Sequence, residues 1–89
     1  MPTSHLIIKG KVQGVFYRAT AKEAANKLGI TGWIKNSREG NVEAVISGSE
    51  QQIKKFINWC KQGPQDAEVE EVIVKEKEET AFDRFVIIR

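Results

Sequence analysis

The sequence predicts an α+β fold in which two helices cover one face of a mostly antiparallel sheet. Segments with alternating apolar residues are typical of strands with one buried face, and two segments with apolar residues three and four positions apart are typical of amphipathic helices. Their order is strand, helix, strand, strand, helix, strand. Two separate β-α-β units have right-handed crossovers, which place both helices on the same side of one sheet. The prediction is therefore a ferredoxin-like α/β sandwich of order βαββαβ, with an additional C-terminal strand.

Length and composition are those of one globular domain, which we assign to residues 3–89. The chain has 89 residues, of which 40% are apolar and 29% are charged, and its net charge is +2. So small an excess of basic residues does not indicate a nucleic-acid or membrane partner. The sequence has no apolar run long enough to cross a membrane and no signal-peptide pattern. We expect a cytoplasmic protein that is a monomer.

The first half of the chain contains a strand, a helix and a hairpin. Alternation predicts a strand from His5 to Val12. Apolar residues at helical spacing predict a helix from about Arg18 to Leu28, for which Gly29 is a natural left-handed stop. Two further strands are predicted at 31–36 and 41–47. The residues between them have the composition of a hairpin loop, so we expect these two strands to be antiparallel.

The second half contains a helix and two strands. Ser49 and Gln52 have the spacing of a capping box, and the apolar stripe that follows predicts a helix that ends at Gly63-Pro64. The remaining segments are a strand at 69–74, a charged and solvent-exposed strand end at 76–79, and a buried closing strand at 85–88.

The stretch from Gly10 to Arg18 is the first candidate for a functional site. It joins a strand to a helix through a glycine-containing loop, so several backbone N–H groups converge near the positive end of the helix dipole. Arg18 lies where the loop becomes helix, and a guanidinium group can form two parallel charge-assisted bonds with a phosphoryl group. A glycine-containing loop of this kind is a plain connection between strand and helix about as often as it is an anion-binding site. Its glycine spacing fits neither the P-loop nor the dinucleotide fingerprint, which disfavours a nucleotide-binding fold.

Asn36 is the second candidate. It ends the second predicted strand, and in this topology it can face the loop that ends in Arg18. Its amide can hold a water molecule in line with a phosphorus atom, and positioning with charge neutralisation supplies most of the catalysis of phosphoryl transfer. On composition alone, an asparagine before a turn is more often only a turn residue.

Other chemically capable side chains have simpler roles. His5 has no Cys or carboxylate partner at a metal-ligand spacing, so we expect no metal site and no cofactor. Cys60 lies on the apolar stripe of the second helix, where core packing is expected, and as the single cysteine it excludes an internal disulfide. Trp33 and Trp59 could be stacking platforms, although single tryptophans packed on a sheet or helix are commoner.

Two parts of the sequence resemble signatures of the acylphosphatase family. The first signature is matched by Gly10-Lys11-Val12-Gln13-Gly14-Val15-Phe16-Tyr17-Arg18. The second is matched by Gly32-Trp33-Ile34-Lys35-Asn36, followed by Gly40, Val42 and Gly48. Trp59 and Gly63-Pro64 also fit, so the resemblance covers nearly the whole chain. It implies the same ferredoxin-like fold.

The resemblance also implies an activity and a site. Acylphosphatases hydrolyse the carboxyl-phosphate bond of small acyl phosphates to a carboxylate and inorganic phosphate, without a metal or cofactor. The phosphate-binding arginine falls on Arg18, and the asparagine that orients the attacking water falls on Asn36. The phosphate-binding backbone amides fall on Gln13, Gly14, Val15, Phe16, Tyr17 and Arg18. The leaving group is good and the substrate's own phosphoryl oxygen can accept the proton, so no general base is required. Ile34, where a smaller residue is expected, and Ala21, where some members have threonine, leave rate and substrate preference open.

Two other functions stay open. The same fold serves non-catalytic ligand- or RNA-binding modules, and Ile7, Lys9, Trp33 and Lys35 could form a small aromatic and basic surface of that kind. The near-neutral net charge argues against RNA. The chain could also be an acylphosphatase-like domain of a larger carbamoyl-transfer protein. Because it begins with Met and ends on the last predicted strand, we expect a free-standing protein.

Overall fold

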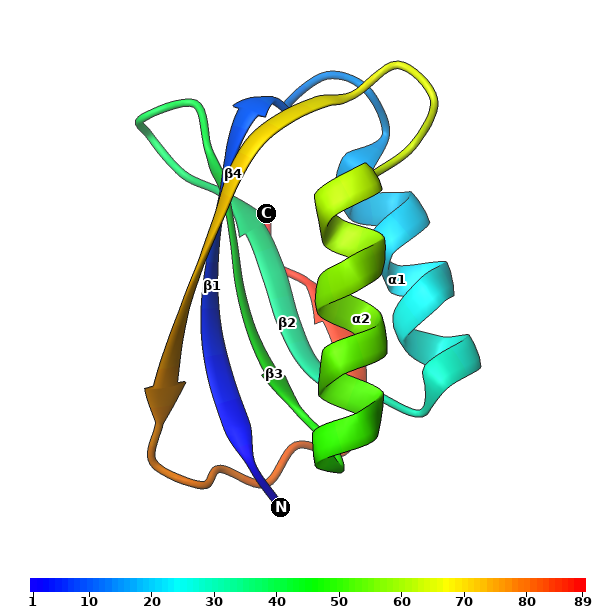
Figure 1. Ribbon diagram of the computed structural model, residues 1–89, viewed down its shortest axis with the longest axis vertical. Coiled ribbons are helices and arrows are strands. Elements are labelled where there is room, and N and C mark those ends of the chain that lie inside the picture. Colours follow the sequence, from blue (N-terminus) through cyan, green and yellow to red (C-terminus); the bar gives the residue numbers. More distant parts are fainter.

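The computed structural model describes residues 1–89 and contains the predicted elements in the predicted order (Figure 1). The elements are β1 (Thr3–Lys11), α1 (Tyr17–Leu28), β2 (Thr31–Asn36), β3 (Val42–Ser47), α2 (Glu50–Gln62), β4 (Glu68–Lys77) and β5 (Phe85–Ile87). The strands form one sheet of order β4-β1-β3-β2-β5, in which every neighbouring pair is antiparallel except β2 and β5. The predicted ferredoxin-like sandwich with an additional C-terminal strand is therefore confirmed.

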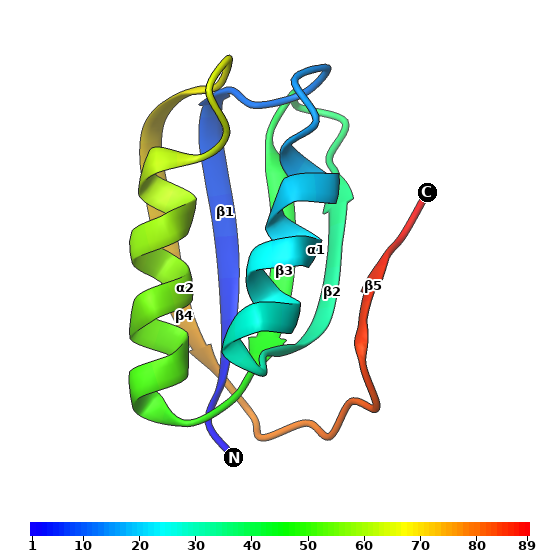
Figure 2. The same ribbon diagram turned by 90° about the vertical axis from the view of Figure 1, so that its right-hand side faces the viewer.

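Both helices lie on one face of the sheet, as Figures 1 and 2 show from two directions. The sheet contributes Leu6, Ile8, Ile34, Val42, Ala44 and Ile46 to the core, and the helices contribute Ala21, Ala25, Ile53, Phe56 and Cys60. Small alanines on α1 let that helix approach the sheet closely, whereas Phe56 of α2 fills the space between the layers. Its ring lies 5.9 Å from that of Phe85 in β5, so the closing strand is attached to the same core.

Several strand boundaries differ from those predicted. β1 begins at Thr3 rather than His5, and β4 extends beyond the predicted 69–74 at both ends. The reason is the pairing of these two strands: Thr3 lies opposite Lys77 and Lys11 opposite Glu68. Backbone hydrogen bonds continue along both strands after the apolar residues end, and apolar alternation alone does not report such bonds. β5 is shorter than predicted and ends at Ile87.

The segment between β4 and β5 crosses from one edge of the sheet to the other and passes close to the N-terminus (Figure 2). Thr80 joins this segment to the ends of β1 and β3 by hydrogen bonds. The backbone N–H of Thr80 donates to Thr3 Oγ1 over 3.0 Å, and its carbonyl oxygen accepts from Ser47 Oγ over 2.9 Å. Because the segment crosses the sheet, β5 pairs with the free edge of β2, and the two strands are parallel. Neither helix is long and apolar enough to cross a membrane.

Candidate active site

The loop between β1 and α1 turns through two residues in the left-handed region. Gly14 has φ 75° and Phe16, the residue before the helix, has φ 63°. A left-handed conformation costs a residue other than glycine about 1–2 kcal/mol. Phe16 adopts it although its side chain is 80% exposed, so no burial of its ring offsets that cost. The loop is therefore held in a strained, sharply turned conformation at the start of α1.

The two helices begin in different ways. At α2, the Ser49 side chain accepts from the backbone N–H of Gln52 and the Gln52 side chain accepts from that of Ser49, which confirms the predicted capping box. At α1, Phe16 provides no side-chain cap and the first turn contains no acidic residue. The first N–H groups of a helix have no partner inside it. Those of α1 are therefore free, at the positive end of the helix dipole, to bind an anion.

Arg18 and Asn36 line the same cavity, which has a volume of about 420 Å³. Its lining residues are Val12, Gly14, Phe16, Tyr17, Arg18, Ala19, Asn36, Ile87 and Arg89. A neighbouring hollow of about 450 Å³ shares Arg18, Asn36 and Arg89 and adds Lys35 and Ile88. The fold thus brings together the loop, the start of α1 and the end of β2, as the sequence predicted for the two halves of the site.

The side-chain oxygen Oδ1 of Asn36 is buried and has no hydrogen-bond partner within the protein. It is the only buried side-chain nitrogen or oxygen atom in this condition. A buried acceptor without a donor costs about 1–3 kcal/mol, so in a native protein such an atom calls for an explanation, such as a bound water molecule, an ion or a catalytic role. Asn36 lines the cavity with Arg18, so its side chain lies next to the space that a water molecule or ligand would occupy.

Gln13 connects the loop to the hairpin that follows Asn36. Its Nε2 donates to the carbonyl oxygens of Ser37, over 2.9 Å, and Asn41, over 2.8 Å. The hairpin is itself closed by a 2.9 Å bond from the Ser37 N–H to the Asn41 carbonyl. The sequence predicted a role only for the backbone amide of Gln13. The structure gives its side chain a role as well, because this side chain joins the two segments that carry the candidate residues.

The side chains of Val15 and Tyr17 face the protein interior, so only their backbone amides are available to a ligand. Val15 is buried, and the Tyr17 hydroxyl donates a 2.7 Å bond to the Cys60 carbonyl in α2. Burial raises the pKa of the Tyr17 phenol far above its usual range, and the neighbouring Cys60 adds to this shift. Tyr17 therefore stays neutral and attaches the start of α1 to α2.

The other chemically capable residues lie away from the cavity. Cys60 is buried in the core as predicted, and burial raises the pKa of its thiol to about 12, so it is not a nucleophile at neutral pH. Trp59 packs against Phe56 and Tyr17. His5 does have a carboxylate partner that its sequence neighbours did not reveal, since its Nε2 lies 2.6 Å from Glu43 on the adjacent strand. No group of three or more His, Cys, Asp or Glu side chains is close enough to hold a metal ion.

The sheet face opposite the helices carries the residues considered for RNA binding. Strand register places Trp33 and Lys35 of β2 on this face, and the Lys35 ammonium lies 5.4 Å from the centre of the Trp33 ring. Glu43 of β3 lies between the basic residues and contacts both His5 and Lys35, the latter at 3.8 Å. A carboxylate at this position repels phosphate groups, so the face lacks the uniformly basic character of a nucleic-acid surface.

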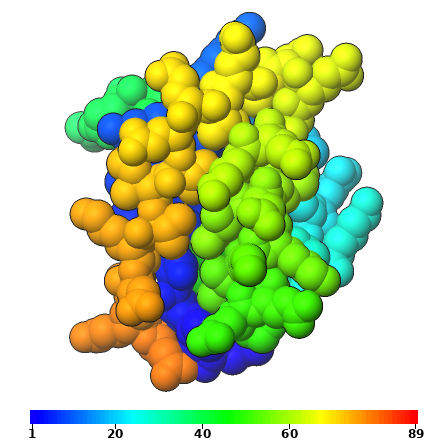
Figure 3. All heavy atoms as spheres, viewed as in Figure 1, coloured from blue at the N-terminus to red at the C-terminus, as the bar shows by residue number.

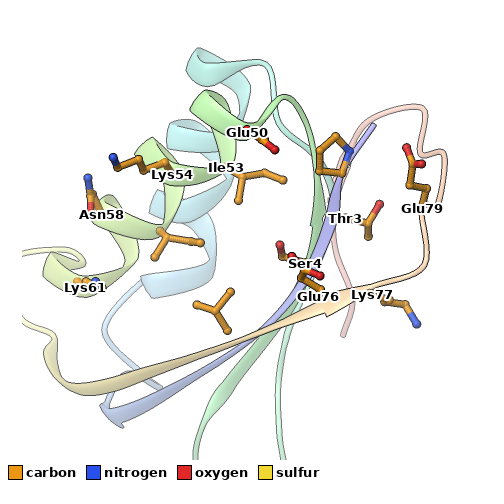
Figure 4. A pocket seen from close by; sticks show the side chains of 13 residues that line it. Thr3, Ser4, Glu50, Ile53, Lys54, Asn58, Lys61, Glu76, Lys77 and Glu79 are labelled. Atoms are coloured by element: carbon orange, nitrogen blue, oxygen red, sulfur yellow. The ribbon is translucent and has the colours of Figure 1, made fainter.

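The largest hollow lies elsewhere, between α2 and β4, with a volume of about 690 Å³. Figure 3 shows β1 in blue at its floor, between β4 in orange and α2 in green. Figure 4 shows its side chains, which come from α2, from β1 and β4 across from it, and from the chain segments directly next to those two strands. Its charged residues are Glu50, Glu76, Glu79, Lys54, Lys61 and Lys77. These charges balance, and none of the residues of either sequence signature lines it, so it does not coincide with the site predicted from the sequence.

Two residues near the cavity were missed by sequence reasoning. Arg89 lines both the cavity and the neighbouring hollow, and its only sequence signal is a charged residue directly after an apolar strand. Lys35 lines the hollow alone. Lys35 directly precedes Asn36 in β2, whereas the proximity of Arg89 to Asn36 depends on which strand β5 pairs with, and the sequence did not specify that partner.

The fold is an open-faced α/β sandwich that places an uncapped helix start, an arginine and an unpartnered asparagine at one cavity. The sequence model of the acylphosphatase family matches residues 4–87. An acylphosphatase of Syntrophus aciditrophicus is 44% identical over 99% of this chain and 93% of its own. The acylphosphatase of Bacillus subtilis superposes with a TM-score of 0.96 at 31% identity over the whole of both chains. The chain also matches 12% of full-length HypF, described in a phosphate- and nucleotide-bound form, with a TM-score of 0.91 and 27% identity.

The chain belongs to the acylphosphatase family, and it is an enzyme of that class.

Proposed function

We propose that this protein hydrolyses the carboxyl-phosphate bond of small acyl phosphates, with Arg18 and the loop amides binding the phosphoryl group and Asn36 orienting the attacking water. One observation carries the proposal. Arg18, the uncapped start of α1 and Asn36, whose Oδ1 has no partner within the protein, line a single cavity. The first two bind negative charge, and the third accepts a hydrogen bond from a water molecule.

The phosphoryl group would lie at the start of α1. There the backbone amides from Gln13 to Arg18 and the Arg18 fork neutralise its oxygens, each charge-assisted bond contributing about 1.5–3 kcal/mol. Charge on these oxygens is stabilised by preorganised donors that need no rearrangement during the reaction. The strained turn at Gly14 and Phe16 holds the amides in place before substrate arrives.

The attacking water would donate a hydrogen bond to Asn36 Oδ1. This bond orients the water so that a lone pair on its oxygen points toward the phosphorus atom. The water oxygen bonds to phosphorus, the bond from phosphorus to the acyl oxygen breaks, and the electron pair leaves with the carboxylate. The water's proton passes to a phosphoryl oxygen, so the products are a carboxylate and inorganic phosphate. An amide cannot act as a strong base, and with so good a leaving group none is required.

Steady-state hydrolysis of benzoyl phosphate tests the proposal. Arg18→Ala should weaken binding of inorganic phosphate and reduce kcat/KM about 10²–10³-fold, the usual cost of losing a donor to developing charge. Asn36→Ala should reduce kcat by a similar factor while phosphate still binds. Matched controls are Arg84→Ala and Asn58→Ala, both exposed and away from the cavity. Wild-type turnover in both Arg18→Ala and Asn36→Ala would refute these residue roles.

Monomeric state and cytoplasmic location stay predictions. Light scattering after size-exclusion chromatography tests the first, and cell fractionation tests the second. Binding to RNA would oppose the prediction of a small-molecule substrate, and a gel-shift titration at low and moderate salt detects it.

A further inference from the structure

Arg89 follows β5 and lies beside Asn36. β5 runs parallel to β2, with Val86 opposite Trp33 and Ile87 opposite Ile34, and the Ile88 N–H donates to the Ile34 carbonyl over 2.9 Å. Continuing this register brings Arg89 level with Asn36. Because side chains alternate along a strand, both residues then share the helix-covered face with Ile34 and Ile87. Both line the cavity that contains Arg18.

The charged side chains that line the cavity are all basic. They are Arg18 and Arg89, and the adjoining hollow adds Lys35 but no Asp or Glu. The ion pairs of the structure join Met1 to Glu79, His5 to Glu43 and Lys35 to Glu43, so neither arginine has an acidic partner. Two guanidinium groups at one cavity repel each other, and this arrangement is stabilised by a ligand that carries more than one negative charge.

A phosphoryl group at neutral pH is such a ligand, since it carries a charge between −1.5 and −2. We propose that Arg89 is a second phosphoryl-binding residue, which contacts a non-bridging phosphoryl oxygen from the Asn36 side of the cavity while Arg18 contacts the group from the α1 side. This inference rests on the proposed function. In phosphoryl transfer the charge is spread over the three non-bridging oxygens, so a cation beside them stabilises substrate and transition state together.

Substrates with different acyl groups can show whether Arg89 binds the phosphoryl group or the acyl group. Non-bridging oxygens are the same in every acyl phosphate, so the effect of Arg89 should not depend on the acyl group. A guanidinium that instead bound the acyl part would favour acyl groups that carry a further negative charge. Benzoyl phosphate, whose acyl group is neutral, and succinyl phosphate, whose acyl group ends in a carboxylate, separate these two roles.

The test compares Arg89→Ala, Arg89→Lys and the control Arg84→Ala, which removes the same charge from an exposed position outside the cavity. Calorimetric titration with inorganic phosphate should give a dissociation constant about tenfold higher for Arg89→Ala, the low end expected for a charged hydrogen bond that solvent can reach. The kcat/KM for benzoyl and succinyl phosphate should fall by similar factors. Arg89→Lys should recover part of both losses, and Arg84→Ala should match the wild type.

Two outcomes would overturn the proposal. The first is phosphate affinity in Arg89→Ala equal to that of Arg84→Ala. The second is a loss of kcat/KM confined to succinyl phosphate, which would assign Arg89 to the acyl group. The phosphate titration also separates this proposal from the proposed function. If the wild-type protein hydrolysed neither substrate, the proposed acyl phosphate hydrolysis would be refuted. The affinity of each variant for phosphate would still decide the role of Arg89.

Discussion

The side-chain amide of Gln13 donates a 2.9 Å hydrogen bond to the carbonyl oxygen of Ser37, the residue directly after Asn36. A second bond of 2.8 Å reaches the Asn41 carbonyl across the same hairpin. One side chain of the loop between β1 and α1 thereby helps to hold the hairpin, and with it Asn36, in place relative to Arg18. The alignment of the two halves of the site depends on this contact as well as on the sheet.

Replacing Gln13 with Leu should separate alignment from binding. The change removes both hydrogen bonds at similar side-chain volume. The two carbonyl oxygens keep their backbone donors, the N–H groups of Gly40 and Ser37, so the loss is that of two net hydrogen bonds, about 1–3 kcal/mol of stability. A shift of Asn36 by a fraction of an ångström should lower kcat about tenfold with little change in KM, because Arg18 and the loop amides still bind the phosphoryl group. Urea unfolding and steady-state kinetics measure the two effects.

Gln51→Leu is the matched control, since Gln51 is exposed on α2 and has no side-chain hydrogen bond. It should leave kcat unchanged. If Gln13→Leu turned over substrate at the wild-type rate, the alignment role of Gln13 would be wrong.

Two glycines of the first signature should respond differently to alanine. A Cβ on Gly10 would lie 2.1 Å from the backbone carbonyl oxygen of Glu68, so Gly10→Ala should separate β1 from β4 and greatly destabilise the protein. A Cβ on Gly14 meets nothing within 4 Å, so only its φ of 75° opposes the change. Gly14→Ala should therefore fold, with a loss of about 1–2 kcal/mol.

Thermal unfolding of the two variants measures this difference. Equal destabilisation by both would show that the close approach of β4 does not limit position 10. In the folded Gly14→Ala protein, any movement of the loop amides appears separately as weaker binding of inorganic phosphate.

Cys60 should make stability fall at alkaline pH. Burial raises the pKa of its thiol from the usual 9.0 to about 12, so between these values the unfolded chain loses a proton that the folded protein retains. The stabilisation is complete below pH 9 and is lost as pH rises toward 12, with a slope that approaches about 1.4 kcal/mol per pH unit. Urea unfolding at pH 9 and pH 10 measures the slope before the Tyr17 phenol contributes strongly.

Cys60→Ala is the corresponding variant. It should lower stability at every pH because it leaves space in the core, but it should remove most of the slope between pH 9 and pH 10. A slope that is the same with and without the thiol would contradict the assignment of this pH dependence to Cys60.

The fold could be predicted largely because its signals are local. Alternation in β1, helical spacing in α1 and α2, and the glycines that end both helices depend on residues close together in the chain. Gly29 has φ 77°, as a left-handed stop requires, and Gly63 also has a positive φ, of 67°. The ends of β1 and β4 were predicted less well because they depend on backbone pairing between Thr3 and Lys77, which lie at opposite ends of the sequence.

The site was predicted in outline for the same reason. A loop before a helix, an arginine at its start and an asparagine before a hairpin can be recognised in sequence, and the family resemblance connected them. The acceptors of the Gln13 side chain, the His5–Glu43 contact and the position of Arg89 could not be recognised, because each depends on which strands become neighbours.

The sequence by itself determined the order of the elements, their buried faces, the helix ends and the loop that carries the candidate phosphoryl-binding groups. These follow from side-chain periodicity and from steric limits on single residues. The tertiary structure alone decided that β5 returns beside β2, which brings Arg89 next to Asn36, and that the Gln13 side chain holds the hairpin against the loop. Such relationships are fixed by the closure of the sheet, which pairs residues far apart in the chain.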